Sequence, residues 1–271
     1  MLYGGLRYDG KSGDGAQNSV NSTERRSLFI PQYANVDTLG LRGSYEYLPG
    51  TKDEADQIAS NLKSHSIPYS YYEGNDGTEE SFKGLDGTKP RLLHIATHGF
   101  YLTEQDALRT DFARPLMLEE DRHAYHEDKP MTRSGLLLSG CQAALDHQEL
   151  PAGAEDGILT AQEISKLDLR GLDLVVLSAC QTGLGDITSG EGVFGLQRGF
   201  KQAGARTIIM SLWKVSDSAT RQLMTSFYGH YLSGKSKEQA FRMAQDGLRK
   251  QGMPNQKKPD WAAFVMLDGI L

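Results

Sequence analysis

Cysteine is scarce in this sequence, which has 271 residues and only 2 Cys. So few cysteines exclude a disulfide framework and predict a reducing, cytoplasmic location. No apolar run approaches the roughly 18 to 20 residues of a membrane-spanning helix, and the N-terminus lacks a signal-peptide pattern, so we expect no membrane contact. A basic excess is also missing. The net charge is −6 and the pI is near 5.7, which argues against direct contact with nucleic acid.

The residues that are present have the balance of a folded protein, with 38% hydrophobic and 24% charged side chains. The length suits one large domain or two small ones, and we predict a single domain over residues 1–271. Two segments are expected to be mobile loops. Residues 9–27 are rich in Gly, Ser and Asn, and residues 100–133 are long, charged and without a periodic pattern.

Strand-like and helix-like segments alternate along the chain. Apolar runs typical of strands occupy residues 2–8, 68–72, 91–97, 135–140, 173–179, 206–213 and 262–267. Helical spacing of apolar residues occupies residues 54–63, 78–85, 160–167, 191–203, 217–232 and 236–251. This alternation predicts an α/β sandwich with a mostly parallel sheet.

Two glycine motifs indicate nucleotide binding by pattern but fail on context. Residues 229–236 (GHYLSGKS) match a phosphate loop, yet they follow a helical segment instead of a strand. The alternative is that Gly234 ends one helix and Ser236 caps the next, with Gln239 in capping-box position. Residues 190–195 (GEGVFG) match a dinucleotide fingerprint, but they lie too far from the preceding strand for its tight turn. We therefore expect no nucleotide cofactor.

His94 and His98 have the spacing of a helical zinc site. Their segment is strand-like, however, and residues four apart on a strand lie roughly 13 Å apart. No Glu follows His94, as the metalloprotease pattern requires. We therefore expect no metal site here.

Polar, glycine-containing sequence follows two of the apolar runs, at His98-Gly99 and at Cys180-Gln-Thr-Gly183. In an open α/β sheet, chemistry collects at the carboxyl ends of the strands. Adjacent strands would therefore bring His98 and Cys180 within several Å of each other. A thiol beside an imidazole can perform covalent acyl transfer. The alternative is that Cys180 is a buried apolar residue, as free cysteines usually are.

The stretches HIATHGFY and LVVLSACQTGLGDITSGEGVFGLQRGFKQAGARTIIMSLWKVSD strongly resemble the CHAT family. These are caspase-like cysteine peptidases, related to separases and often fused to tetratricopeptide repeats. The likeness extends to LYGGLRYD, YLPGTKDEADQI, SGLLLSG and WAAFVMLDG, and so covers nearly the whole chain. It implies a caspase-like three-layer sandwich, with a mostly parallel central sheet flanked by helices.

The resemblance implies that Cys180 is the nucleophile of a peptidase and that His98 is its partner. The backbone N–H groups of Gly99 and Cys180 would stabilise the oxyanion. The expected activity is regulated, limited cleavage of a protein substrate, as in bacterial defence or regulated cell death. A tetratricopeptide-repeat sensor is an expected partner, in cis or in trans. The alternative is a catalytically silent interaction module.

Three further residues are candidates for substrate binding. In the related separases, an acidic residue in a segment similar to Trp213-Lys-Val-Ser-Asp217 faces a basic residue just before the cut. Asp217 would therefore select Arg or Lys, or alternatively cap the helix that follows. Asp156 is a second acidic candidate, with turn chemistry beside Gly157 as its alternative. Trp213 lines the cleft or belongs to the core.

The remaining cysteine, Cys141, follows no histidine motif and is expected to be a packed small residue. The long segment 100–133 is a candidate activation loop. Arg114, Arg122 and Arg133 within it are candidate sites of self-cleavage if the enzyme prefers basic residues.

Overall fold

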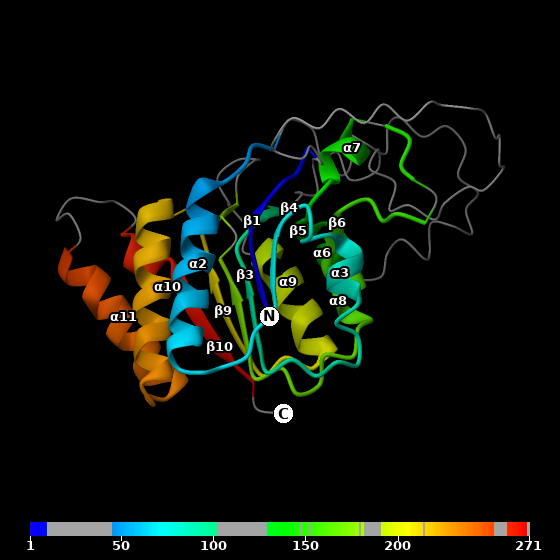
Figure 1. Cartoon of the computed structure of the whole chain (residues 1–271). Coiled ribbons are helices and arrows are strands. Elements are labelled where there is room, and N and C mark those ends of the chain that lie inside the picture. Colours follow the sequence, from blue (N-terminus) through cyan, green and yellow to red (C-terminus); the bar gives the residue numbers. More distant parts are fainter. Residues whose placement is uncertain are drawn as a thin grey trace.

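The computed structural model describes residues 1–9, 45–101, 129–146, 148–151, 153–178, 180–181, 191–213, 215–251 and 259–269 (Figure 1). Of residues 180–181 and 191–194 it describes the backbone alone. Beyond Asp9, the expected loop at 9–27 lies outside these ranges, as do residues 102–128 of the expected loop at 100–133. The ends of that second segment lie in a strand and a short helix, so its predicted bounds are too wide.

A six-stranded sheet forms the centre of the molecule, in the order β10-β9-β7-β3-β1-β2. Its strands are β1 (Leu2–Leu6), β2 (Tyr71–Gly74), β3 (Leu92–Ile95), β7 (Leu174–Leu177), β9 (Thr207–Ser211) and β10 (Phe264–Asp268). Every neighbouring pair is parallel except β9 and β10, which are antiparallel. The predicted mostly parallel sheet is therefore confirmed.

A second, four-stranded sheet lies beyond the carboxyl ends of the central strands, in the order β6-β5-β4-β8. Its strands are β4 (His98–Tyr101), β5 (Ser134–Leu137), β6 (Ile158–Thr160) and β8 (Cys180–Gln181). The strands predicted at 91–97 and 173–179 end early, because the chain leaves β3 and β7 and enters this sheet. His94 and His98 therefore lie on different strands, contrary to the expectation of one continuous strand.

Helices cover both faces of the central sheet (Figure 1). One face carries α2 (Pro49–Ser64), α10 (Asp217–Leu232) and α11 (Lys237–Gln251), with the 3₁₀ turn Asp260–Ala262 beside them. The other carries α9 (Glu191–Ala203) and the short helices α3 (Glu79–Lys83), α6 (Lys129–Thr132) and α8 (Ala161–Ser165). The remaining short helix is α7 (Cys141–Leu145). This arrangement confirms the expected three-layer sandwich.

The core is divided by the sheet, because successive side chains of a strand point to opposite faces. Leu174 and Val176 of β7 join the apolar cluster beneath α2, α10 and α11. Val175 and Leu177 join the cluster beneath α9. The continuous apolar run therefore reflects a strand buried on both faces.

Local structure decides between the alternatives for the phosphate-loop match. Gly229 lies inside α10, and Gly234 adopts a φ of 93° after its end, where glycine is favoured. The Ser236 hydroxyl accepts a 3.2 Å hydrogen bond from the Gln239 N–H, and the Gln239 side chain accepts from the Ser236 N–H. The segment is a helix–turn–helix with a capping box, so the phosphate-loop reading is wrong.

Two smaller expectations are also settled. Cys141 is fully buried in the core at the start of α7, which confirms it as a packed small residue. Arg133 is only 8% exposed, so the prediction of a cleavage site there is wrong for the folded protein. Arg114 and Arg122 lie outside the described residues. In the described ranges, each helix is too short or too polar to cross a membrane.

Candidate active site

The backbone brings His98 and Cys180 together. β4 and β8 are adjacent parallel strands, and His98 is the direct partner of Cys180 in their register. Neighbouring strands lie about 4.8 Å apart. The pairing arises because β3 and β7 are themselves neighbours, and each continues through a short link into the second sheet. Gly99, the second oxyanion candidate, pairs with Gln181 in the same register.

The His98 ring is buried between two tyrosines. Its centroid lies 4.7 Å from the Tyr8 ring and 5.3 Å from the Tyr45 ring. Its Nε2 lies 2.9 Å from the Glu46 carbonyl oxygen. A carbonyl can only accept, so Nε2 carries the proton, and in the neutral ring Nδ1 is the basic nitrogen.

The surroundings also set the charge of His98. Burial lowers the pKa of its imidazole below the ordinary value of 6.5, while the Glu46 carbonyl and the charge of Asp217 oppose that shift. A lowered pKa favours the neutral ring at neutral pH. His98 is therefore suited to accept a proton, as a general base must.

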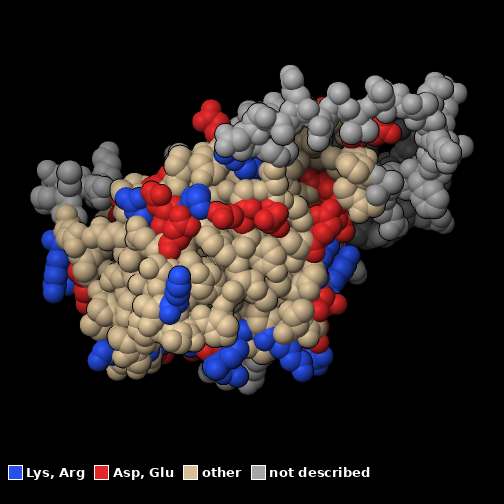
Figure 2. Space-filling view, viewed as in Figure 1, with Lys and Arg blue, Asp and Glu red and all other residues tan. Residues whose placement is uncertain are grey.

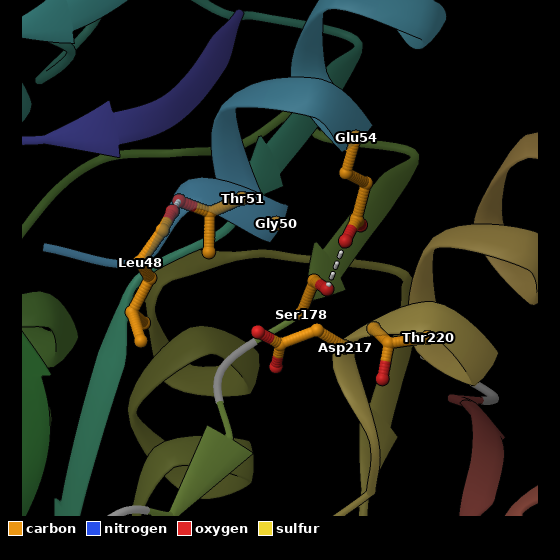
Figure 3. A pocket seen from close by; sticks show the side chains of 7 residues that line it. All are labelled: Leu48, Gly50, Thr51, Glu54, Ser178, Asp217 and Thr220. Atoms are coloured by element: carbon orange, nitrogen blue, oxygen red, sulfur yellow. Dashed lines mark hydrogen bonds between the residues drawn. The ribbon is translucent and has the colours of Figure 1, made fainter.

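A small pocket of about 270 Å³, open to solvent, lies between the N-terminal ends of α2 and α10 (Figure 3). Its lining residues are Leu48, Gly50, Thr51, Glu54, Ser178, Asp217 and Thr220. Ser178 follows β7 and stands two positions before Cys180. The pocket therefore adjoins the strand that carries the candidate nucleophile.

Asp217 belongs to this pocket and is not the cap of α10. The cap is Ser216, whose hydroxyl accepts a 3.3 Å hydrogen bond from the Ala219 N–H. The capping alternative for Asp217 is therefore wrong. Gly50 allows the close approach of α2, because a Cβ added there would lie 2.9 Å from the Asp217 Cβ.

Glu54 is a second carboxylate in the pocket, and it is 2% exposed. Its Oε2 accepts a 2.9 Å hydrogen bond from the Ser178 hydroxyl, and its Oε1 lies 3.1 Å from His94 Nε2. His94 Nδ1 is in turn hydrogen-bonded to the Tyr228 hydroxyl at 3.2 Å. In the sequence, His94 was considered only as a zinc ligand and was rejected. In the structure it belongs to a chain of buried polar contacts beneath the pocket.

Asp156 and Trp213 are placed differently. Asp156 Oδ1 accepts a 2.8 Å hydrogen bond from the Ile158 N–H, and Gly157 between them has a φ of 75°. The turn alternative for Asp156 is therefore confirmed, and its carboxylate faces another cluster. Trp213 is partly buried against the core beneath α10, which favours its core alternative.

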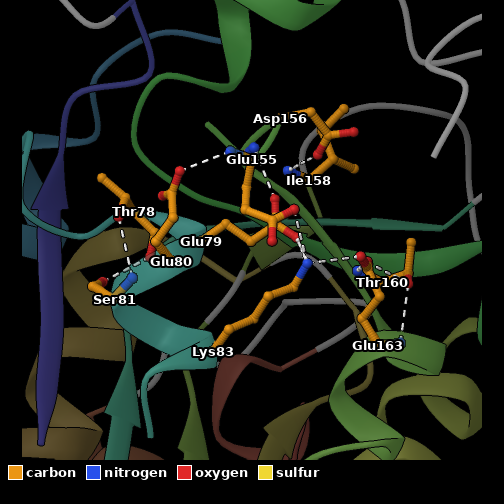
Figure 4. A network of polar contacts seen from close by, with 11 residues as sticks. Thr78, Glu79, Glu80, Ser81, Lys83, Glu155, Asp156, Ile158, Thr160 and Glu163 are labelled. Carbon is orange, nitrogen blue, oxygen red and sulfur yellow. Dashed lines mark hydrogen bonds and ion pairs between the residues drawn. The ribbon is translucent and has the colours of Figure 1, made fainter. Parts of the chain in front are cut away.

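The cluster around Asp156 joins α3 to the loop before β6 (Figure 4). Lys83 Nζ lies 2.8 Å from Glu79 Oε1, 3.0 Å from Glu155 Oε2 and 3.1 Å from Glu163 Oε1. Glu79 Oε2 also accepts a 2.9 Å hydrogen bond from the Gly157 N–H. Burial raises the pKa of Glu79, although the Lys83 ammonium opposes the shift. These contacts are structural ties between elements.

Sequence reasoning missed four features of the site. Tyr8 and Tyr45 act through ring packing, and Glu46 acts through its backbone carbonyl, so their residue types give no chemical signal. Glu54 stands within a helical pattern and meets Ser178 only through the tertiary fold. Among the described side chains, no group of three His, Cys, Asp or Glu residues is placed to hold a metal ion.

Comparison with known proteins places the chain in a family. A family profile described as the CHAT domain matches residues 12–269. Tetratricopeptide repeat protein 28 of Homo sapiens is 30% identical over 191 residues, which are 66% of this chain and 7% of that protein. The protein of the same name from Mus musculus is 32% identical over 115 residues, or 41% of this chain and 4% of its own length.

The chain thus corresponds to a small part of these repeat proteins. The profile, in contrast, covers most of the sequence, and its family is related to caspase-like peptidases. The fold, the paired strands and the profile agree that this chain belongs to the CHAT-domain family.

Proposed function

We propose that this protein is a cysteine endopeptidase with Cys180 as nucleophile and His98 as base. The observation that carries the proposal is the direct pairing of these two residues across β4 and β8. The neutral His98 ring, with its proton on Nε2, supports it further, because Nδ1 is then the nitrogen that accepts a proton.

The reaction would proceed through a thioester. His98 Nδ1 takes the thiol proton while Cys180 Sγ attacks the scissile carbonyl, and the N–H groups of Gly99 and Cys180 stabilise the oxyanion. The C–N bond breaks, and His98 passes the proton to the leaving amine. Water then attacks the thioester, losing a proton to His98, and returns Cys180 to the thiol as the carboxylic acid product leaves.

The pocket beside Cys180 would receive the side chain before the cut. Asp217 supplies a carboxylate there, and its charge is felt at His98, which supports a pocket close to the dyad. A basic residue would bind it through a charge-assisted hydrogen bond. An extended substrate segment would carry that residue into the pocket.

We further propose that cleavage is limited, takes place in the cytoplasm, and serves bacterial defence or regulated cell death. Family membership supports such a role. The two similar repeat proteins support a tetratricopeptide-repeat regulator, in cis or in trans.

A peptide-library cleavage profile tests the proposed activity. We expect the wild type to cut after basic residues, Cys180→Ala to cut nothing, and Cys141→Ala, which changes the buried cysteine, to cut like the wild type. Cleavage that survives Cys180→Ala contradicts the proposal. A wild type that cuts no member of the library, alone or with its repeat partner, supports the silent interaction module instead.

A further inference from the structure

Hydrogen-bond acceptors dominate the polar groups of the pocket between α2 and α10. The Ser178 hydroxyl gives its hydrogen to Glu54, so it has only lone pairs left to offer a ligand. The Asp217 carboxylate lies beside it and accepts only (Figure 3). A ligand that fits these groups must be rich in N–H donors.

A polar atom of this pocket, the hydroxyl oxygen of Thr220, has no hydrogen-bond partner within the part of the chain that the structure describes, and Thr220 is only 4% exposed. A buried polar group without a partner is costly, so a bound donor would stabilise the site. Threonine adopts two rotamers in helices, so rotation about the Cα–Cβ bond of Thr220 would turn its hydroxyl toward a ligand.

The charge balance favours a cation. Asp217 and Glu54 bring two formal negative charges to the pocket. The N-terminal ends of α2 and α10 oppose them, but each helix end is equivalent to only about half a positive charge. With His94, which lies beside Glu54, counted as neutral, the sum stays negative, so an acidic side chain would be repelled and a basic one attracted.

We propose that the Ser178–Glu54 pair makes this pocket prefer arginine to lysine at the cut. The inference rests on the proposed peptidase function and names the residue that its pocket selects. A guanidinium is planar and carries five N–H donors, so it can bond Asp217 and Ser178 together. An ammonium is compact, with three donors, and matches a point charge better than two neighbouring acceptors.

Ser178 determines specificity by contacting the guanidinium, and Glu54 is a positioning residue that orients the Ser178 hydroxyl. His94 lies against the far oxygen of Glu54 and helps to hold the carboxylate in place.

The test measures how fast Cys180 is labelled by three matched electrophilic peptides that end in arginine, lysine or citrulline. Citrulline keeps the shape of arginine without its charge. We expect the wild type to prefer arginine to lysine by about tenfold, and to citrulline by more. Ser178→Ala should lower the arginine-to-lysine ratio several-fold, and Glu54→Gln should lower the arginine-to-citrulline ratio several-fold.

Two buried residues elsewhere provide matched controls. Ser139→Ala removes another buried serine whose hydroxyl is hydrogen-bonded, and Glu79→Gln changes another buried glutamate. Both should leave the two ratios unchanged. Thermal melting identifies variants that fail to fold. If Ser178→Ala or Glu54→Gln fails to fold, Thr220→Val is tested in its place, and the proposal predicts that it lowers the arginine preference.

The outcomes separate this inference from the proposed function. Equal labelling by the arginine and lysine probes, or ratios that Ser178→Ala and Glu54→Gln leave unchanged, overturns the inference while the peptidase proposal stands. If no probe labels Cys180, the peptidase proposal fails. An NMR titration with N-acetyl-arginine amide and N-acetyl-lysine amide then decides the inference: tighter binding of the arginine compound supports it, and equal or weaker binding overturns it.

Discussion

Single atoms around His98 decide which of its nitrogens can act as a base. The Glu46 carbonyl fixes the proton on Nε2, the rings of Tyr8 and Tyr45 bury the imidazole, and Asp217 adds a nearby negative charge. Burial has the largest effect on the pKa of His98 and lowers that pKa. The ring is therefore favoured in its neutral form, with its proton on Nε2.

Labelling of Cys180 should depend on pH through His98. Because the pKa of His98 is below 6.5, the rate should fall only when the pH drops below that value. Asp217 raises this pKa, so Asp217→Asn should lower it further and shift the acid limb to a lower pH. A pH profile of labelling with a neutral peptide probe measures both effects.

The exposed residue Asp53, which pairs with Arg221, provides the control. Asp53→Asn should leave the acid limb in place. If the acid limb of Asp217→Asn lies at the same pH as that of the wild type, or at a higher pH, the electrostatic link between Asp217 and His98 is contradicted.

Gly50→Ala tests the close approach of α2 to Asp217. The new Cβ would lie 2.9 Å from the Asp217 Cβ, so the carboxylate must shift. We expect labelling by an arginine probe to slow about tenfold or more, because small misplacements at a site are costly. Alanine is a good helix former, so the melting temperature of Gly50→Ala should stay close to that of the wild type. Loss of stability together with unchanged labelling would contradict this view of the pocket.

At the scale of elements, helices were easier to predict than strand ends. The spacing predicted helices over 191–203 and 217–232, and α9 and α10 have these bounds, because apolar residues mark one face of each helix throughout. The strand runs extended too far, since Ala96, Thr97 and Ser178 are buried although the chain has already left the central sheet. Apolar composition reports burial and not sheet membership.

The cluster between α3 and the loop before β6 predicts a pH-dependent stability. The pKa of Glu79 is raised above its ordinary value of 4.5, so the unfolded chain releases this proton before the folded one does. Its stabilising contribution is present at low pH and is lost as the pH rises. Glu79→Gln cannot ionise, keeps an acceptor for Gly157, and leaves Lys83 its other two carboxylates.

Because the pKa of Glu79 is raised to about 8, the free energy of unfolding of Glu79→Gln should gain on the wild type, by about 1 to 3 kcal/mol, between about pH 5 and pH 8. Urea denaturation at each pH measures the difference. A gap that closes as the pH rises would show that Glu79 is ionised in the folded protein at low pH.

For the whole molecule, the site depends on contacts between distant parts of the chain. The positions of His98 and Cys180 after two apolar runs predicted that they would meet if the strands were adjacent, and β4 and β8 are adjacent. The Glu46 carbonyl and the Glu54–Ser178 bond were not predictable, because they join segments 52 and 124 residues apart. Periodicity and motif spacing carry no information about such contacts.

Charge is also distributed unevenly over the molecule. On the face in Figure 2, Asp and Glu side chains form a band across the upper part, toward the N-terminal end of α2, and many of the Lys and Arg side chains lie along the lower rim and the left edge. With a net charge of −6, we expect such a surface to attract basic proteins at a distance.

Cleavage of a basic protein substrate should accordingly slow several-fold as the salt concentration rises from about 50 to about 200 mM. The preference for arginine over lysine in short peptides should not change, because the pocket sets it at close range. Stopped-flow and peptide assays in the same buffers measure the two effects. If the cleavage rate of a basic substrate does not change with salt concentration, electrostatic steering by this surface is ruled out.

The most direct test is mass spectrometry of the protein after reaction with an electrophilic arginine peptide. We expect one label per chain, on the peptide that contains Cys180, and none in Cys180→Ala. His98→Ala should label at least about 100-fold more slowly, as for loss of a general base. Labelling on Cys141, or a His98→Ala variant that reacts as fast as the wild type, would contradict a working His98–Cys180 pair.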